Sequence, residues 1–201
     1  MNEPKLAANP LFQFQEWLAD AIAHSGLDFP NAMSLATADG EGRPSVRMVL
    51  LKGLSSEGGF QFFTNYESRK ANDLSANPFA ALCFYWEKIH RSVRVEGKVE
   101  KLSAEESQEY FDTRARESRI GAWASPQSRE LAGRAELEEK FKEMEQRFRE
   151  QEKIPVPPHW GGYRLIPARI EFWTNGAHRL HDRFVYEADG NGGWTVKRLA
   201  P

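Results

Sequence analysis

Apolar side chains alternate with polar ones over several short stretches of the chain. In residues 91–102, Val93, Val95 and Val99 alternate with charged residues, which indicates a strand with one buried and one solvated face. Residues 31–53 predict two strands around an Asp39-Gly40 turn. The same signals predict further strands over residues 58–65, 79–86, 163–175, 178–188 and 193–201.

The N-terminal part of the chain has a helical spacing of apolar residues instead. A helix begins after Asn9, which can cap it, with Pro10 in the first helical position, and it ends near Gly26. One stripe of this helix should pack against the body of the domain, and it consists of Leu11, Phe14, Leu18 and Ile22.

The middle of the chain is also helical. Ser103 and Glu106 form a capping box that opens a helix running to about residue 114, and a longer, highly charged helix lies within residues 130–152. A short helix over residues 68–76 interrupts the strands. Hairpin-linked strands with inserted helices predict a mainly β protein with helices (α+β), built as an antiparallel β-barrel with peripheral helices. We expect a flexible arm, residues 1–8, and one domain, residues 9–201, which includes the helical segment 103–150.

Composition narrows the functional classes. Of the 201 residues 40% are hydrophobic and 28% charged, so a core can form. The net charge of −2 argues against a general nucleic-acid-binding protein. The single cysteine, Cys83, excludes an internal disulfide, and its apolar surroundings predict a buried strand residue. Since no stretch resembles a leader or a membrane span, we expect a cytoplasmic protein without membrane contact.

A group of cations stands where the short helix begins. The sequence ESRK places Ser68, Arg69 and Lys70 at a helix N-terminus, where unpaired N–H groups and the helix dipole favour an anion. This arrangement predicts a phosphate site, although a serine-capped surface helix has the same pattern.

A second cluster has the same chemistry. Tyr110, Arg114 and Ser118 recur at four-residue steps, so they share one helical face if the helix continues that far. Two hydroxyls and a guanidinium suit a second phosphate, and a solvated helix face is the alternative. Arg47 and Lys52 stand at the two ends of an apolar strand, so both can reach one cleft only if Lys52 lies past the strand end or a bulge intervenes.

The sequence AHRLHDRF, residues 177–184, carries a third set of cationic groups. As a strand, it would place Arg179, His181 and Arg183 on one face and Asp182 on the other. Two arginines and a histidine are costly to bury unless an anion meets them. The face is therefore either solvated or a ligand site, and we expect Asp182 to form a structural salt bridge.

Several other chemistries have no support. The chain has no glycine-rich nucleotide loop, no HExxH spacing among its five histidines and no GxSxG setting for a serine nucleophile. We therefore expect neither a metal site nor serine hydrolase chemistry.

Seven segments together resemble the pyridoxine (pyridoxamine) 5′-phosphate oxidase family. They are RMVLLK, FFTNYESRKA, YFDTRARESRIGAWAS, PQS, HWGGYRL, IEFWTNGAHRLHDRF and the terminal RLAP, in family order over residues 9–201. The resemblance implies an FMN-binding split β-barrel that works as a homodimer, with FMN in clefts between the subunits. It also implies oxidation of pyridoxamine or pyridoxine 5′-phosphate by O2 to pyridoxal 5′-phosphate, with release of hydrogen peroxide.

The resemblance also implies site residues. FMN would contact Arg47, Met48, Val49, Leu50, Leu51, Lys52, Phe63, Thr64, Ser68, Arg69, Lys70, Ser92, Gln127, Ser128, Trp173 and Arg183. The substrate phosphate would bind Lys52, Tyr110, Arg114 and Ser118. Arg179 and His181, the implied catalytic residues, would meet the substrate ring, and Arg183 would favour negative charge on the flavin.

The chain departs from the family pattern at four places. Phe63 replaces a frequent tyrosine, Ser92 a flavin-contacting glutamine, and Ala115 the proline of an Arg-Pro step. Residues 1–8 do not match the arm that covers the substrate in some members. Two alternatives stay open: a related flavin oxidase acting on another ring, as in phenazine biosynthesis, and a non-catalytic carrier of FMN or pyridoxal phosphate.

Overall fold

The computed structural model of the chain describes residues 6–55 and 58–201. Its strands are β1 (Ala32–Ala38), β2 (Pro44–Leu50), β3 (Gly53–Leu54), β4 (Phe60–Asn65), β5 (Phe79–Trp86), β6 (Arg91–Lys101), β7 (Trp160–Thr174), β8 (Asp182–Ala188) and β9 (Trp194–Arg198). Its α-helices are α1 (Pro10–His24), α2 (Arg69–Ala76), α3 (Ala104–Asp112), α4 (Arg116–Ala124) and α5 (Arg134–Arg147), and short 3-10 turns span Glu87–Ile89 and Ala177–Arg179.

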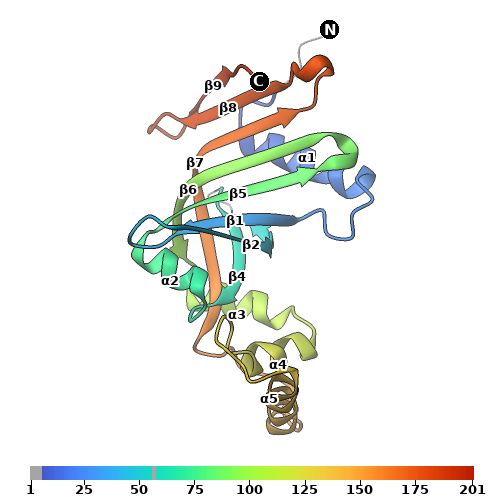
Figure 1. The fold of residues 1–201 in the computed structure, drawn as a ribbon, viewed down its shortest axis with the longest axis vertical. Helices are drawn as coiled ribbons and strands as arrows, with labels where there is room; N and C mark the ends of the chain where they lie inside the picture. The colour runs from blue at the N-terminus through green and yellow to red at the C-terminus, as the bar shows by residue number, and fades with distance from the viewer. Residues whose placement is uncertain (1–5, 56–57) are drawn as a thin grey trace.

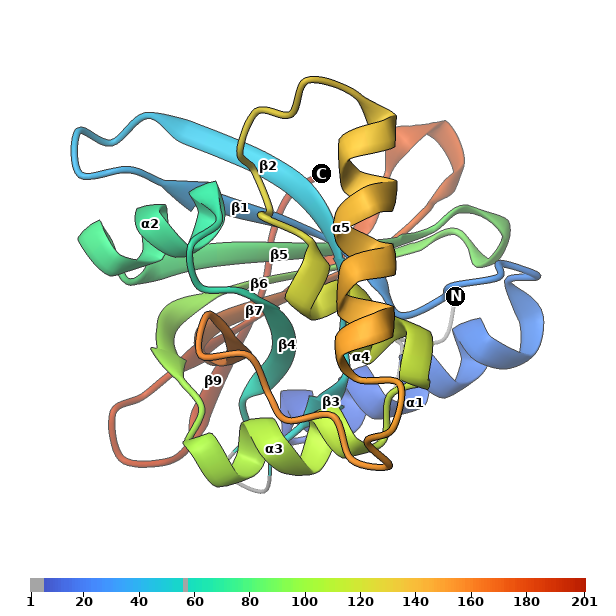
Figure 2. The same ribbon diagram turned by 90° about the horizontal axis from the view of Figure 1, so that it is seen from below.

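The strands form one antiparallel sheet. Its order is β2-β1-β5-β6-β7-β4-β3, and β8 and β9 extend it from β7. The long strand β7 runs from the helices α3, α4 and α5 at one end of the molecule to β8 and β9 at the other (Figure 1). Seen along that axis, α4 and α5 lie in front of the curled sheet and α1 lies to one side (Figure 2). The predicted α+β class, an antiparallel barrel-like sheet with peripheral helices, is confirmed.

The main core lies between the sheet and α1. Phe14 of α1 is fully buried, and its ring centroid lies 4.9 Å from those of Phe60 and Phe84. Asn9 caps this helix as predicted, because its side-chain oxygen accepts the Leu11 N–H at 2.8 Å. The predicted stripe is wrong at Ile22, which is 63% exposed, because Ala21 occupies the buried position of the last turn.

A second, smaller core joins the helical segment to the start of β7. It contains Phe111, Ile120, Phe148, Ile154 and Trp160. Between α3 and α4 the helix is interrupted at residues 113–115, so the condition for one helical face through residue 118, a helix that continues that far, is not met. Phe111 of α3 packs on Trp160, and Trp123 of α4 packs on Phe148, so one aromatic cluster holds both helices.

Two strand predictions need correction. Cys83 lies on β5 but is only half-buried, because the alternation of that strand sends Leu82 and Phe84 into the core and residue 83 to the other face. β8 begins at Asp182, whereas a strand was predicted from residue 178. His178 and Arg179 have φ values of 56° and 64°, a left-handed turn that no strand adopts.

Residues 1–5 of the predicted arm lie outside the described residues. Beyond them, Ala7 is tied to the domain on both sides: its N–H donates to Gln13 Oε1 at 3.0 Å, and its carbonyl accepts the Tyr186 hydroxyl at 2.8 Å.

Candidate active site

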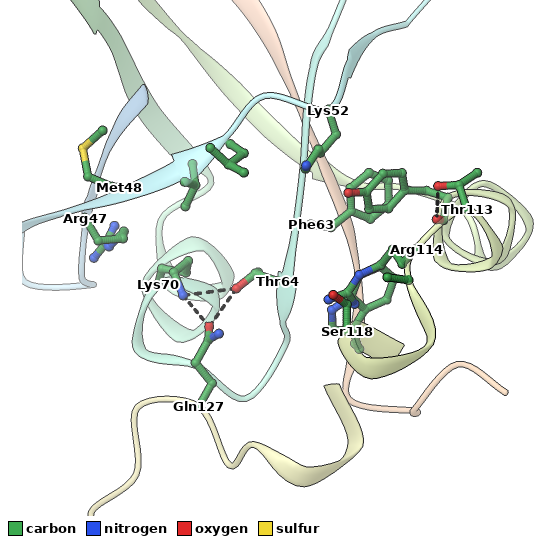
Figure 3. Close-up of a pocket in the computed structure, with 15 residues that line it drawn as sticks. Arg47, Met48, Lys52, Phe63, Thr64, Lys70, Thr113, Arg114, Ser118 and Gln127 are labelled. Atoms are coloured by element: carbon green, nitrogen blue, oxygen red, sulfur yellow. Dashed lines mark hydrogen bonds between the residues drawn. The ribbon is translucent and has the colours of Figure 1, made fainter. Parts of the chain in front are cut away.

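A cavity of about 630 Å³ opens between the sheet edge and the helical segment (Figure 3). Twelve of its lining residues were predicted from the sequence: Arg47, Met48, Val49, Leu50, Lys52, Phe63, Thr64, Lys70, Tyr110, Arg114, Ser118 and Gln127. Thr113, Ala115 and Trp160 complete the lining. The cavity therefore unites the two predicted phosphate clusters.

Lys70, at the start of α2, occupies one side of this cavity. Its ammonium group donates to Gln127 Oε1 at 2.6 Å and to Thr64 Oγ1 at 3.1 Å (Figure 3). Burial, and then the nearby positive charge of Arg47, lower the pKa of Lys70 to about 8. A bound anion would reverse that shift, since it would stabilise the charged form.

Ser68 lies beneath this corner. Its side chain is fully buried and donates to the Asn65 carbonyl at 2.7 Å. The serine hydroxyl therefore supports Lys70, whose ammonium lies 3.2 Å from it, and does not line the cavity itself. Arg69 is exposed beside the helix start.

Arg47 comes from β2 on the same side as Lys70. Its guanidinium donates to the Thr37 hydroxyl at 2.7 Å and to the Leu35 carbonyl at 3.1 Å. Lys52 reaches the same cavity because it lies past the end of β2, where its N–H pairs with the Gln61 carbonyl at 2.9 Å. The first of the two predicted solutions for this pair is confirmed.

The opposite wall is a cluster of three nearly parallel rings. The centroid of the Phe63 ring lies 3.9 Å from that of Tyr110 and 5.4 Å from that of Trp160. The Lys52 ammonium lies 5.9 Å from the centroid of the Tyr110 ring, and the Arg114 guanidinium lies 4.9 Å from that of Trp160. Two of the three rings therefore each carry a cation over an aromatic face.

Arg114 lies in the interruption between α3 and α4. Burial lowers the pKa of its guanidinium, and its buried Nη1 has no hydrogen-bond partner among the described residues. Ser118, in the first turn of α4, lines the same corner (Figure 3). A buried donor without an acceptor, in a cavity, is a strong indication of an anionic ligand.

A second pocket, of about 470 Å³, shares no lining residue with the first. It contains the predicted residues Ser92, Trp173 and Arg183, with Tyr85, Arg94, Glu171 and Pro201. Burial alone would raise the pKa of Glu171, but hydrogen bonds from Arg183 and Arg94 hold it below its usual value.

The AHRLHDRF segment does not form the predicted alternating face. Arg179 lies in the turn before β8, and His181 accepts the Gly176 N–H at 3.1 Å and packs on Trp173 at 4.8 Å. Neither side chain lines the first cavity or the second pocket. Asp182 pairs with Arg198 at 3.1 Å, so the predicted structural salt bridge is confirmed.

Two other predicted residues line neither pocket. Leu51 belongs to the main core, and Ser128 is exposed, with a φ of 71°. Trp160, Glu171 and Arg94 were missed as site residues. HWGGYRL and IEFW do carry Trp160 and Glu171, but nothing in the local sequence shows which arginine each of them meets.

The donors of the first cavity suit anions. Within the described ranges, no group of three or more His, Cys, Asp or Glu side chains could hold a metal ion. None of the helices in the described part of the chain combines the length and apolar character that a membrane crossing requires.

Comparison with known proteins agrees with this geometry. The family described as pyridoxamine 5′-phosphate oxidase matches residues 21–148, and the pyridoxine 5′-phosphate oxidase C-terminal dimerisation region matches residues 160–201. The chain is 54% identical to the pyridoxine/pyridoxamine 5′-phosphate oxidase of Bordetella petrii over 99% of this chain and 92% of that one. It is 52% identical to the enzyme of that name from Cupriavidus taiwanensis, over 100% and 93%.

Solved structures show the same fold. PhzG from Burkholderia lata, in complex with tetrahydrophenazine-1-carboxylic acid, superposes with a TM-score of 0.89 at 31% identity, covering 97% of this chain and 94% of that one. A pyridoxamine 5′-phosphate oxidase-related, FMN-binding protein from Nostoc punctiforme has a TM-score of 0.75 at 17% identity, over 98% and 100%. The fold is the split β-barrel of these proteins, and the chain belongs to the pyridoxamine 5′-phosphate oxidase family.

Proposed function

We propose that this protein is an FMN-dependent oxidase that converts pyridoxamine 5′-phosphate, pyridoxine 5′-phosphate or both into pyridoxal 5′-phosphate, with O2 as oxidant and hydrogen peroxide as product. The observation that carries the proposal is a single cavity with a cationic group at each end. Arg47 and Lys70 stand at one end, and Lys52 and Arg114 stand across from them (Figure 3). A phosphorylated cofactor and a phosphorylated substrate need two such cationic binding sites.

FMN is the cofactor that the family supports, and the donors at the start of α2 fit its phosphate. The N-cap residue Ser68 makes no side-chain capping bond at the first turn of α2, and Arg47, Arg69 and Lys70 surround this helix start, so it would suit an anion. Lys70 is 9% exposed and has only neutral acceptors within hydrogen-bond distance. Phosphate oxygens would give this ammonium the counter-charge that it lacks.

The substrate phosphate fits the opposite corner. The cavity is lined by Arg114, whose Nη1 has no hydrogen-bond partner within the described ranges, and by Lys52, Tyr110 and Ser118. The Arg114 guanidinium lies over the Trp160 ring, 4.9 Å from its centroid, so this contact helps to hold its N–H donors in the cavity.

The reaction then depends on position. Bound FMN would supply the acceptor for hydride from the carbon that bears the amine or alcohol, with O2 as the final oxidant, and for the amine substrate water would then release the nitrogen as ammonia. The four residues around the substrate phosphate (Lys52, Tyr110, Arg114 and Ser118) fix that end of the substrate. Arg179 and His181 orient its ring. Arg183 favours negative charge near the flavin.

A second copy of the chain completes the site in this proposal. Ser92, Trp173 and Arg183 line a separate pocket, and β8 lies at the far end of the molecule from α3 and α4 (Figure 1). Trp173 and Arg183 also lie within the stretch that matches the C-terminal dimerisation region. A homodimer can bring Arg183 of the partner subunit, with its Arg179 and His181, to the first cavity.

One alternative has an observation in its favour. PhzG was solved with a ring carboxylic acid that carries no phosphate, and it shares this fold. A carboxylate is also an anion, so the Arg114 corner alone does not decide between the two substrates.

The test is to purify the protein, look for bound flavin and follow hydrogen peroxide. We expect peroxide from pyridoxamine 5′-phosphate and very little from pyridoxamine without its phosphate. Peroxide from a tetrahydrophenazine carboxylic acid, and none from either phosphorylated vitamer, would favour the alternative. Bound FMN without peroxide from any of these would favour a carrier.

A further inference from the structure

Asp73 has no part in the function proposed above, although it lies directly behind the cofactor-phosphate corner. It occupies the turn of α2 after Lys70 and is only 6% exposed. A buried carboxylate costs free energy unless it is paired and hydrogen-bonded. The hydrogen-bond partners of Asp73 therefore indicate its role in the fold.

All of these contacts lead to Arg47. Thr37 and Ser45 donate their hydroxyl protons to Asp73 Oδ2, at 2.6 and 2.9 Å. The same two hydroxyl oxygens accept from the Arg47 guanidinium, Thr37 Oγ1 from Nη1 at 2.7 Å and Ser45 Oγ from Nη2. Arg47 Nη2 also lies 3.6 Å from Asp73 Oδ2.

The carboxylate decides the direction of these hydrogen bonds. A hydroxyl can donate or accept, but it has a single proton. Because Asp73 accepts both protons, the two oxygens turn their lone pairs toward Arg47 and hold its Nη atoms from one side. The Leu35 carbonyl holds Nη1 from a second direction, at 3.1 Å.

We propose that Asp73, acting through Thr37 and Ser45, is a positioning residue that fixes the Arg47 guanidinium for the phosphate of FMN. The inference rests on the proposed function, since it assumes that this corner binds the cofactor phosphate. Without Asp73 the two hydroxyls are free to turn, and Arg47 loses its fixed orientation in the cavity.

A purely structural role is the competing explanation. Asp73 also joins α2 to the hairpin of β1 and β2, so its loss could loosen the whole corner. The two roles differ in what they do to riboflavin, which has the ring of FMN without its phosphate. A loosened fold weakens both ligands alike, whereas a misplaced Arg47 weakens FMN alone.

The experiment measures the dissociation constants of FMN and riboflavin for the flavin-free protein by fluorescence quenching, and reports their ratio as phosphate selectivity. Asp73→Asn keeps an oxygen that can accept both hydroxyl protons, and it removes the charge. Asp73→Ala removes both. We expect selectivity in Asp73→Ala to be at least about tenfold below that of Asp73→Asn, the cost of misplacing a charged hydrogen-bond donor.

Two further variants serve as a control and as a substitute for Asp73→Ala. Asp39→Ala is the matched control, because Asp39 pairs with Arg43 in the exposed turn of the same hairpin, and selectivity should not change. If Asp73→Ala does not fold, the Thr37→Val, Ser45→Ala double variant removes the two hydroxyls instead and should lower selectivity by the same mechanism.

The outcomes separate the two levels of inference. Equal selectivity in Asp73→Ala and Asp73→Asn, or an unchanged ratio in the double variant, overturns the role of Asp73 while FMN binding stands. A wild-type protein that binds riboflavin as tightly as FMN overturns the phosphate site itself, and the role of Asp73 with it.

Discussion

Lys70 is a buried cation whose hydrogen-bond partners are all neutral, so its charge depends on pH in an accessible range. Its pKa falls from 10.5 to about 8 in the folded, ligand-free protein. Below pH 8 the ammonium is charged and can meet the dianionic phosphate, and above pH 8 a proton must first be taken up. We therefore expect the dissociation constant of FMN to rise about fiftyfold between pH 8 and 10.

Fluorescence titration across this range checks the prediction, with riboflavin measured in parallel to remove the titration of the flavin ring. Lys70→Met is the control: it should bind FMN weakly at every pH and lose the dependence above pH 8. Parallel profiles for wild type and Lys70→Met would show that another group titrates.

Arg114 offers the most direct test of the proposed binding site for the substrate phosphate. Its buried Nη1 has no hydrogen-bond partner in the part of the chain that the structure describes, and its guanidinium lies over the Trp160 ring. We expect Arg114→Ala to raise the KM for pyridoxamine 5′-phosphate about 10- to 100-fold, as for loss of a charge-assisted hydrogen bond. Arg114→Lys keeps the charge and loses the planar fork of donors, so its KM should lie between those of wild type and Arg114→Ala. A KM for unphosphorylated pyridoxamine that rises equally would contradict a phosphate-specific role.

At this scale the sequence predicts the residue types well and their partners poorly. Arg47, Lys70 and Arg114 were identified from motifs that stand close together in the chain. Asp73 and Trp160 were not, because their roles come from contacts with strands or loops about 30 to 50 residues away, such as Thr37 with Asp73 and Arg114 with Trp160. Local spacing carries no record of such contacts.

Among the elements, the interruption between α3 and α4 offers a direct test. Ala115 has φ −54° and ψ 145°, close to the values of proline, and its N–H donates no hydrogen bond to any of the described residues. Ala115→Pro restores the Arg-Pro step of the family. We expect it to raise the free energy of unfolding by about 0.4–1 kcal/mol, because it restricts the unfolded chain.

Denaturant unfolding measures that gain, and the KM for pyridoxamine 5′-phosphate should stay within about twofold of wild type. Ala122→Pro, inside α4, is the contrasting variant, since it should cost about 3 kcal/mol or more. A destabilised Ala115→Pro protein would mean that Arg114 cannot adopt the extended backbone that a following proline requires.

The element that sequence reasoning placed incorrectly is the AHRLHDRF segment. Alternating charges predicted a strand from residue 178, but β7 pairs with β8 only from the Thr174 and Asp182 pair onward. Gly176 permits the intervening turn, because a Cβ there would lie 1.9 Å from the Leu180 carbonyl oxygen. A period-two pattern of polar residues has no buried face to fix it, so it does not distinguish a strand from a turn.

For the whole molecule, the main question is whether the first cavity and the second pocket belong to one active site shared between two subunits. Arg114 and Arg183 line separate cavities. If each active site combines the first cavity of one subunit with the second pocket of the other, the activity of a heterodimer depends on which subunit carries each arginine substitution. Two kinds of heterodimer, purified through different affinity tags on the two chains, distinguish this from a site within one chain.

In the first heterodimer one chain carries Arg114→Ala and the other Arg183→Ala. Shared sites would leave one active site intact and the other doubly damaged, so about half of wild-type activity should remain. In the second heterodimer one chain carries both substitutions and its partner carries none. Each shared site then holds one damaged arginine, and activity should be close to that of the single variants. Sites confined to one chain predict the reverse, with low activity in the first heterodimer and about half in the second, because the unaltered chain would then hold a complete site of its own.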